Sequence, residues 1–364
     1  MSIEQDIDSE FDKQLADVTK ANLMVVGGTG VGKSSLINRV FGEKLAPTGA
    51  GAPVTRGCHK YEREHVPVVI FDTEGYEVVA NGGIDNSNFQ KSVIAEIERR
   101  ESLELKDQIH LYWYCISANG HRITDYDIAN IKALSLRQAN LALVITQCDA
   151  EEINENGEGV TSLAFRQVLK EAGISNNVFE TSATIEENLQ LDALIEWSTN
   201  SLPNEKLKDA FIGAQISNIE LKDKQASAAI LYASAAAGAA AGLNPVPMSD
   251  ALAIVPIQMA MAARLAQIYG FNALGNSVLG LLKAQVVSLV GRQVAASLTK
   301  LIPVLGQMIN AVTAAGITNG LGYALKHTYR TAYVETLRTG TPPDWAALFA
   351  KIDIFSYITQ YTKR

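Results

Sequence analysis

Eight residues near the start of the chain combine glycines with a lysine and a hydroxyl group at a spacing that suits phosphate binding. They are Gly27-Gly28-Thr29-Gly30-Val31-Gly32-Lys33-Ser34, which match the pattern G-x-x-x-x-G-K-[ST]. Glycines let successive backbone N–H groups turn inward around an anion at the start of a helix. The lysine can neutralise the β- and γ-phosphates of a nucleotide, and the serine hydroxyl can bind Mg²⁺. The pattern therefore predicts a nucleoside triphosphate site.

The segments on either side of this loop are those that such a motif requires. The apolar run at 23–26 predicts a buried strand before the loop, and apolar residues at helical spacing over 35–41 predict a helix after it. That context favours a phosphate loop over a glycine-rich turn that precedes an ordinary helix. We therefore expect contacts to the nucleotide from Gly28, Thr29, Gly30, Val31, Gly32, Lys33, Ser34 and Ser35.

Two residues beyond a second apolar run could hold the metal ion and contact the terminal phosphate. The run spans 66–71 and ends at Asp72, and Gly75 follows three residues later. The Asp72 carboxylate could hold Mg²⁺ through water, and the Gly75 amide could contact the γ-phosphate and so respond to its presence. The pattern D-x-x-G is weak by itself, because it also marks ordinary turns.

The remaining metal ligands are expected from hydroxyl groups. Thr55 is our candidate beside Ser34, because it lies in a glycine-rich stretch, 49–57, that suits a mobile switch. Thr48 is the competing candidate. The expected metal site is Ser34, Thr55 and Asp72, and the expected catalytic residues are Lys33, Thr55 and Gly75.

Two more strand ends carry residues that could select the base. The apolar run 141–145 leads into Thr146-Gln147-Cys148-Asp149, and the run 177–180 leads into Thr181-Ser182-Ala183. With these segments in place, the chain resembles the translation-factor-like GTPases, including the Era-like members, whose five ordered sequence boxes lie at strand ends. The resemblance covers about residues 20–200. It implies an α/β fold with a mixed, mostly parallel six-stranded sheet and flanking helices, and Mg²⁺-dependent binding of GTP and GDP.

The resemblance also implies which base is bound. In that family the aspartate of the fourth box accepts hydrogen bonds from guanine N1–H and N2–H₂, which adenine lacks. Asp149 occupies that position here, and Ser182 and Ala183 match the fifth box, whose backbone meets guanine O6. Gln147 stands where the family usually has a lysine that covers the base, so we expect weaker GTP binding without a change of base. Guanine is therefore expected, and an ATPase is the less favoured alternative.

A second departure from the family concerns hydrolysis. Tyr76 follows Gly75 at the position where Ras-like relatives carry the glutamine that orients the attacking water. Tyrosine cannot act as an orienting amide, so we expect slow hydrolysis that is stimulated by a homodimer formed through the GTPase domain or by a partner. A non-hydrolysing, GTP-gated scaffold or membrane-binding module is the alternative. Glu74, Glu77 and Arg122 are interpreted as solvated loop charges.

The distribution of charge divides the chain. The net charge is −8, but residues 1–224 hold 21 Lys or Arg against 35 Asp or Glu, whereas 225–325 hold only five charged residues. The contrast predicts an acidic GTPase domain over 21–203, which argues against nucleic acid as a partner. It also predicts an Ala- and Gly-rich helical domain over 204–364, joined by an N-terminal helix over 1–20 that packs with it.

This second part carries a resemblance of its own. The run from Ala236 to Asp250 is similar to the uncharacterised helical domain found behind GTPase domains in many bacteria, and the whole arrangement resembles the interferon-inducible, immunity-related GTPases. Those relatives share the G-x-T-G-x-G-K-S loop, the Val54-Thr55 pair and a helical domain built from both chain ends. A last amphipathic helix is expected from Trp345 to Tyr361.

Two stretches without charged residues, 225–249 and 301–325, are long enough to cross a bilayer as helices. Proline and asparagine interrupt the first and polar side chains occur throughout the second, which argues against insertion. A soluble helical bundle, a peripheral domain on an anionic membrane surface and a spanning hairpin stay open as alternatives.

Three widely spaced cysteines without a secretory leader predict a cytoplasmic protein, with the membrane surface as a second location.

Overall fold

The computed structural model forms two compact units. One unit is Thr19–Asn218, and the other includes Ile219–Arg364. The residues that the structure describes are 20–42, 52–55, 58–63, 66–73, 89–120, 122–137, 140–182, 184, 189–242, 249–271, 280–281, 284–288 and 311–362. The expected N-terminal helix, Thr48, Glu74, Gly75, Tyr76, Glu77 and Ala183 lie outside the described residues.

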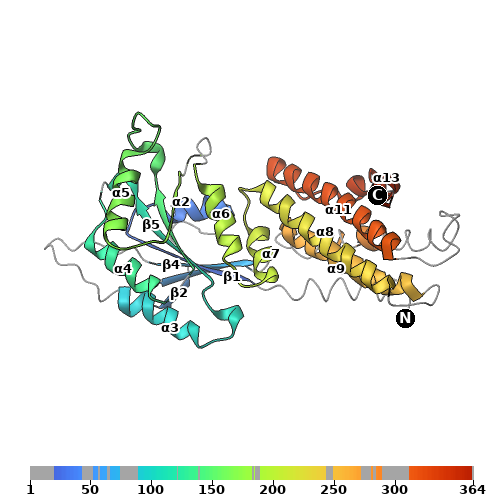
Figure 1. Cartoon of the computed structure of the whole chain (residues 1–364), viewed down its shortest axis with the longest axis horizontal. Coiled ribbons are helices and arrows are strands. Elements are labelled where there is room, and N and C mark those ends of the chain that lie inside the picture. The colour runs from blue at the N-terminus through green and yellow to red at the C-terminus, as the bar shows by residue number, and fades with distance from the viewer. Residues whose placement is uncertain are drawn as a thin grey trace. The chain divides into compact units, whose positions relative to one another are not determined.

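A mixed sheet forms the centre of the first unit (Figure 1). Its strands are β1 (Ala21–Gly27), β2 (Ala52–Thr55), β3 (Cys58–Glu62), β4 (Val68–Thr73), β5 (Leu111–Ser117), β6 (Leu141–Thr146) and β7 (Asn177–Glu180), in the order β2-β3-β4-β1-β5-β6-β7. The pairs β4–β1, β1–β5, β5–β6 and β6–β7 are parallel, and β2–β3 and β3–β4 are antiparallel. The predicted fold class is thus confirmed, and β2 adds a seventh strand at the antiparallel edge.

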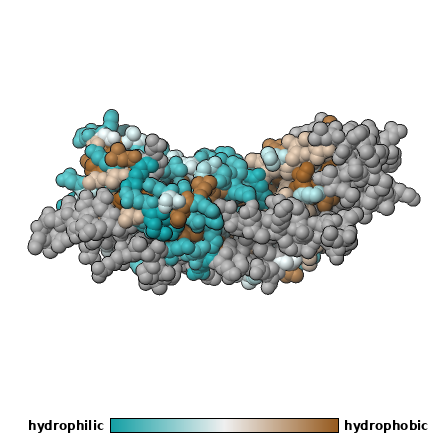
Figure 2. Space-filling model, turned by 90° about the horizontal axis from the view of Figure 1, so that it is seen from below, coloured by the Kyte–Doolittle hydropathy of each residue, from teal (hydrophilic) through white to brown (hydrophobic). Residues whose placement is uncertain are grey.

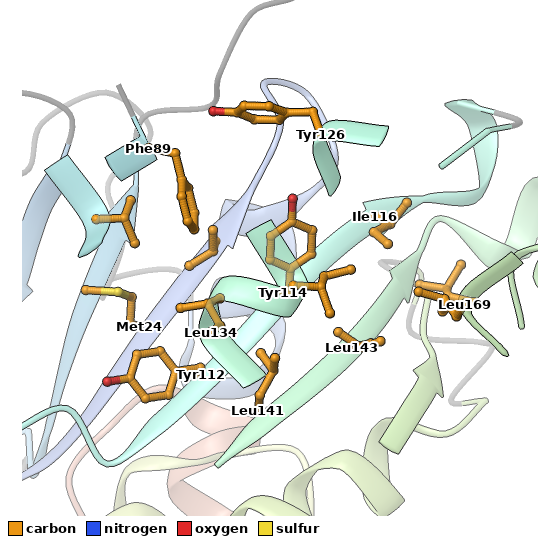
Figure 3. Close-up of a cluster of buried hydrophobic side chains, with 14 of the residues drawn as sticks. Met24, Phe89, Tyr112, Tyr114, Ile116, Tyr126, Leu134, Leu141, Leu143 and Leu169 are labelled. Carbon is orange, nitrogen blue, oxygen red and sulfur yellow. The ribbon is translucent and has the colours of Figure 1, made fainter. Parts of the chain in front are cut away.

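Helices cover both faces of this sheet. They are α2 (Lys33–Phe41), α3 (Ala95–Glu101), α4 (Asp125–Ser135), α5 (Val160–Glu171), α6 (Leu191–Asn200) and α7 (Glu205–Ala214), with a π-helical turn at Phe89–Ile94 and 3₁₀ turns at Leu105–Asp107, Ala118–Gly120 and Cys148–Ala150. Strands β1, β4 and β6 are buried along their whole length, as parallel strands covered on both sides should be. On one face, side chains of α3, α4 and α5 pack with Met24, Tyr114 and Leu143 of the sheet (Figure 3).

An aromatic cluster fills the other face of the sheet. The rings of Phe41, Trp113 and Phe211 lie within 5.6–6.4 Å of one another between centroids, and Trp113 Nε1 donates to the Ser198 hydroxyl at 3.0 Å. Phe211 belongs to α7, so this helix is part of the sheet unit. The sheet unit therefore continues to Asn218, past the boundary that we predicted after residue 203.

The described part of the second unit is helical. Its helices are α8 (Ile219–Gly242), α9 (Ser249–Ile268), α11 (Ala311–Thr339), α12 (Trp345–Ala350) and α13 (Ile354–Thr362). Glycines allow α11 to approach its neighbours closely, because a Cβ on Gly322 would lie 2.8 Å from the Ile230 side chain of α8, and one on Gly320 would lie 2.6 Å from Ile358 Cα of α13. Among the helices of the described residues, none has both the length and the apolar character needed to cross a membrane.

The C-terminal amphipathic segment differs from its prediction. The single helix expected from Trp345 to Tyr361 is divided into α12 and α13. The division has a local cause, because the Asp353 carboxylate accepts the backbone N–H of Ser356 at 3.1 Å and so begins a new helix.

A buried histidine, His110, connects the start of β1 to the turn that precedes β5. The backbone N–H of Asn22 donates to His110 Nδ1 at 2.9 Å, and His110 Nε2 lies 2.7 Å from the carbonyl oxygen of Leu105. These partners require a proton on Nε2 and none on Nδ1, so the imidazole is neutral. Burial lowers the pKa of His110, and the bond to Leu105 only partly opposes that effect.

We therefore expect the stability of the protein to depend on the protonation of His110. The pKa of His110 is lower in the folded state than its ordinary value of 6.5, so the folded state binds fewer protons than the unfolded state. The contribution of His110 to the free energy of unfolding is therefore fully present above pH 6.5 and is lost as the pH falls below that value. The free energy of unfolding, measured with urea from pH 7.5 to 5, should fall less steeply for His110→Asn than for the wild type. Parallel curves for the two proteins would contradict this role.

Candidate nucleotide-binding site

The phosphate loop connects β1 to α2, and its backbone geometry requires glycine at several positions. Gly30 and Gly32 have φ of 77° and 90°, the left-handed region that other residues rarely adopt. A Cβ on Gly27 would lie 2.4 Å from the carbonyl oxygen of Cys115. Gly28, Val31, Gly32 and Ser34 are half-buried, whereas Thr29, Gly30 and Ser35 are exposed. Because α2 begins at Lys33, the loop places backbone N–H groups at a helix N-terminus, where an anion is favoured.

The ammonium group of Lys33 is buried within this loop. Its Nζ donates to the carbonyl oxygens of Gly27 at 2.9 Å and Gly28 at 3.0 Å, and the residue is only 8% exposed. Burial lowers the pKa of Lys33, while the charge of Asp72 acts in the opposite direction. Neutral carbonyls satisfy the donors but compensate little of the charge, so a phosphate anion would bind here favourably.

Asp72 lies on β4 in register with Val25 of β1, at the edge of the sheet where the phosphate loop begins. Its Oδ1 is buried and has no hydrogen-bond partner in the described part of the chain. Burial raises the pKa of Asp72, and the charges of Lys33 and His59 lower it. A carboxylate oxygen with unused acceptor capacity fits a Mg²⁺ ion, which prefers oxygen ligands and often binds through retained water. Ser34, in the first turn of α2, offers the hydroxyl.

The structure places the backbone of Thr55 in the strand pairing at one side of the sheet. Thr55 ends β2, where it pairs with Cys58 of β3, and Cys58 in turn pairs with Thr73 of β4. Two strand spacings, roughly 10 Å, therefore separate the backbone of Thr55 from that of β4. The segment that we interpreted as a switch is thus paired into the sheet edge at Thr55.

The base-reading segment after β6 is attached to the phosphate loop. The Thr146 hydroxyl donates to the carbonyl oxygen of Val31, and Gln147 Nε2 donates to that of Gly30 at 3.4 Å. The other end of the Gln147 amide accepts from the Ser117 hydroxyl at 2.5 Å and from Asn119 Nδ2 at 3.3 Å. Glutamine in place of the family's lysine therefore keeps a bond to the phosphate loop and adds two partners from the end of β5.

Asp149 and Ser182 lie on adjacent segments. Asp149 is exposed on the 3₁₀ turn after β6, and the N–H of Cys148 donates to the carbonyl oxygen of Thr181 at 3.1 Å. The Ser182 hydroxyl is bonded to that of Thr184 at 2.7 Å. The carboxyl ends of β1, β4 and β6 thus bring Lys33, Asp72, Gln147 and Asp149 to one edge of the sheet.

Sequence reasoning missed three residues that shape this edge. Ser117 and Asn119 orient Gln147 from the end of β5, and Arg39 of α2 contacts the backbone of Ser182. The position of Ser117 and Asn119 after an apolar strand is a signal that could have found them, because the other site residues follow parallel strands in the same way. Arg122, which we interpreted as a loop charge, is exposed.

Comparison with known proteins gives an independent view of this unit. Residues 22–155 match the family model described as the 50S ribosome-binding GTPase. The chain is 40% identical over 93 residues to magnetosome membrane protein 22 of Magnetospirillum gryphiswaldense, covering 24% of this chain and 48% of that protein. It is 27% identical over 163 residues to cell division control protein 10 of Saccharomyces cerevisiae, covering 38% of this chain and 49% of that protein. The chain thus spans about half the length of these curated relatives.

Solved structures show lower sequence identity to this chain. A probable GTP-binding protein, EngB, has a TM-score of 0.37 at 14% identity and covers 50% of this chain and 98% of that one. A variant of Era from Aquifex aeolicus has a TM-score of 0.34 at 19% identity and covers 51% of this chain and 58% of that one. With the phosphate loop, the sheet order and the family match taken together, the first compact unit has the fold of a P-loop GTPase domain.

Proposed function

We propose that this protein hydrolyses GTP to GDP and phosphate with Mg²⁺, and that the bound nucleotide controls association with a second copy of the chain or with an anionic membrane surface. The observation that carries the proposal is the buried pair of Lys33 and Asp72 at the ends of neighbouring strands. Lys33 has no carboxylate oxygen among its hydrogen-bond acceptors in the described structure, and Asp72 Oδ1 has no partner there. A triphosphate and its metal ion would satisfy both.

In this proposal each residue has a defined task. Lys33 exchanges its bonds to the Gly27 and Gly28 carbonyls for bonds to the β- and γ-phosphates, with the loop amides around them. Ser34 and Asp72 hold Mg²⁺, which neutralises charge on the phosphates when it is bound. Thr55 can join them only if β2 separates from β3, so loading with nucleotide would be coupled to a change at the sheet edge. That coupling would make β2 the nucleotide-sensitive element, with Gly75 as the expected γ-phosphate contact.

The base is selected in this proposal at the other end of the site. Asp149 is exposed on a turn that is held from two sides, by the Thr146 and Gln147 bonds to the phosphate loop and by the Cys148 bond to Thr181. A carboxylate fixed in this way accepts from guanine N1–H and N2–H₂, and an adenine in the same place would leave it without donors. Ser182 and Ala183 would present their backbone to guanine O6.

The helical unit exposes individual apolar side chains that are available for association. Leu231 and Tyr232 of α8 are 57% and 74% exposed, and Val312 and Leu337 of α11 are 70% and 51% exposed. Figure 2 shows hydrophilic residues over much of the visible coloured surface of the first unit and mainly apolar ones on that of the second. A similar relative is named as a membrane protein, which supports a membrane surface as one partner. A second copy remains the other partner of the proposal.

Replacing the base-reading carboxylate gives a direct test of guanine selection. We expect Asp149→Asn to lower GTP affinity by at least about a hundredfold and to bind xanthosine triphosphate better than the wild type does, because the amide replaces one of the two acceptors by a donor, which suits the O2 acceptor of xanthine. Isothermal titration with both Mg²⁺–nucleotides measures this. Glu155→Gln, a nearby exposed acidic residue, is the control and should bind GTP as the wild type does. An Asp149→Asn protein with wild-type preference would refute the assignment.

The expected dependence on self-association is tested by turnover. We expect phosphate release per molecule to be slow in dilute solution, on the order of 10⁻⁴ to 10⁻² s⁻¹, and to rise with protein concentration, because Tyr76 cannot orient the attacking water. Lys33→Ala, which should not bind nucleotide, gives the background rate. Constant turnover per molecule over a hundredfold range of concentration, with or without anionic vesicles, would exclude activation by a second copy. GTP binding without any phosphate release would instead support the non-hydrolysing scaffold.

A further inference from the structure

An arginine on the helix that follows the phosphate loop contacts the loop expected to meet the base. Arg39 lies in the last turn of α2, and its Nη1 donates to the carbonyl oxygen of Ser182 at 2.7 Å. The two residues are separated by 143 positions in the sequence. Arg39 is half-buried and Ser182 is buried, so the bond is partly shielded from water. A hydrogen bond from a charged donor in such a place is stronger than a neutral one.

The loop at Ser182 is held from two different elements. The carbonyl oxygen of Thr181 accepts the N–H of Cys148, the residue before Asp149, at 3.1 Å. The next carbonyl along the chain, that of Ser182, accepts from Arg39. Two consecutive peptide groups are thus fixed by the base-reading turn and by the phosphate-loop helix. This arrangement fixes the backbone at Thr181 and Ser182, where the expected base loop begins.

The charge of Arg39 has a second effect at the same place. The carboxylates of Asp149 and Asp192 both interact electrostatically with the guanidinium and favour its charged form, although burial lowers the pKa of Arg39 overall. A positive charge near a carboxylate interacts favourably with it. Arg39 therefore supports both the carboxylate and the backbone segment that would face the base.

We propose that Arg39 is a positioning residue for guanine recognition, because its bond to the Ser182 carbonyl fixes the base-facing loop relative to the phosphate-loop helix. This inference rests on the proposed function, since it assumes that guanine is read by Asp149 and by the loop at Ser182. It adds a physical link between the two ends of the site: α2 starts at the phosphate-binding Lys33 and holds the base loop in its last turn. Loss of the link should weaken base discrimination more than phosphate binding.

The test compares nucleotides that differ only in the base. Arg39→Met removes the charged donor and keeps much of the aliphatic stem, and Arg39→Lys keeps a charged donor. Purine riboside triphosphate serves as the second ligand, since it retains the sugar and phosphates of GTP but lacks O6 and the two donors that Asp149 would accept. Arg137→Met is the matched control, because Arg137 is another arginine of the same unit, paired with Glu98 and Glu101 away from the site. Titration calorimetry measures both affinities, and thermal unfolding checks each fold.

Arg39→Met should lower GTP affinity by about tenfold, the loss expected for one charge-assisted hydrogen bond. Its affinity for purine riboside triphosphate should change little, so that the preference for GTP falls. Arg39→Lys should recover part of that preference, and Arg137→Met should retain all of it. An equal loss for both nucleotides, or no loss, would overturn the role of Arg39 and leave the GTP site standing. Absence of GTP binding by the wild type would instead refute the proposed function itself.

Discussion

The burial of two opposite charges at the ends of β1 and β4 is the constraint on which the rest of the site depends. Lys33 is bonded to backbone carbonyls that carry no net charge, and Asp72 keeps an oxygen without a partner. Burial disfavours the charged form of each residue, and their mutual attraction opposes that effect. Such a site costs stability when it holds no ligand and recovers it when an anion and a cation bind together. A magnesium-bound triphosphate has that combination of charges.

The fold meets this constraint because side chains from distant parts of the sequence lie together at the carboxyl ends of the parallel strands. Parallel pairing places the carboxyl ends of β1, β4, β5 and β6 side by side. The side chains of Thr146 and Gln147 donate hydrogen bonds to the backbone of the phosphate loop. Arg39 of α2 donates to the Ser182 carbonyl of the loop expected to contact the base. In the proposed function these bonds join the phosphate half of the site to the base half, so a nucleotide would bind with little rearrangement between them. Strand β2 takes no part in these bonds, because it is the outermost strand on the antiparallel side of the sheet.

Sequence patterns predicted what is local in this structure. The phosphate loop could be recognised because its glycines, lysine and serine are contiguous and their geometry is set by adjacent backbone. The hydrogen bond between Arg39 and Ser182 could not be predicted, because no sequence pattern shows which arginine donates to a backbone carbonyl 143 positions away. Helix α7 shows the same limit: its apolar face predicts burial, but contacts such as those of Phe211 with Phe41 and Trp113 assign it to the sheet unit. Thr55 was predicted as a metal ligand from the glycine-rich segment around it, and that segment gave no sign that Thr55 pairs with Cys58 in the sheet.

Close helix packing gives a reason for the scarcity of charge in the second unit that does not require lipid. Ala237, Ala241 and Ala314 are buried together with Ile254, and Gly322 leaves no room for a Cβ against Ile230 of α8. Small apolar residues are needed wherever helices approach this closely, in water as well as in a bilayer. A lysine that is buried in the same unit, Lys222 of α8, donates to the Ile268 carbonyl and lies over the Tyr333 ring. Over its described part, the charge-free run 225–249 is therefore accounted for by the interior of a helical unit. In the proposed membrane association, the exposed side chains of Leu231 and Tyr232 on α8 would be among the contacts.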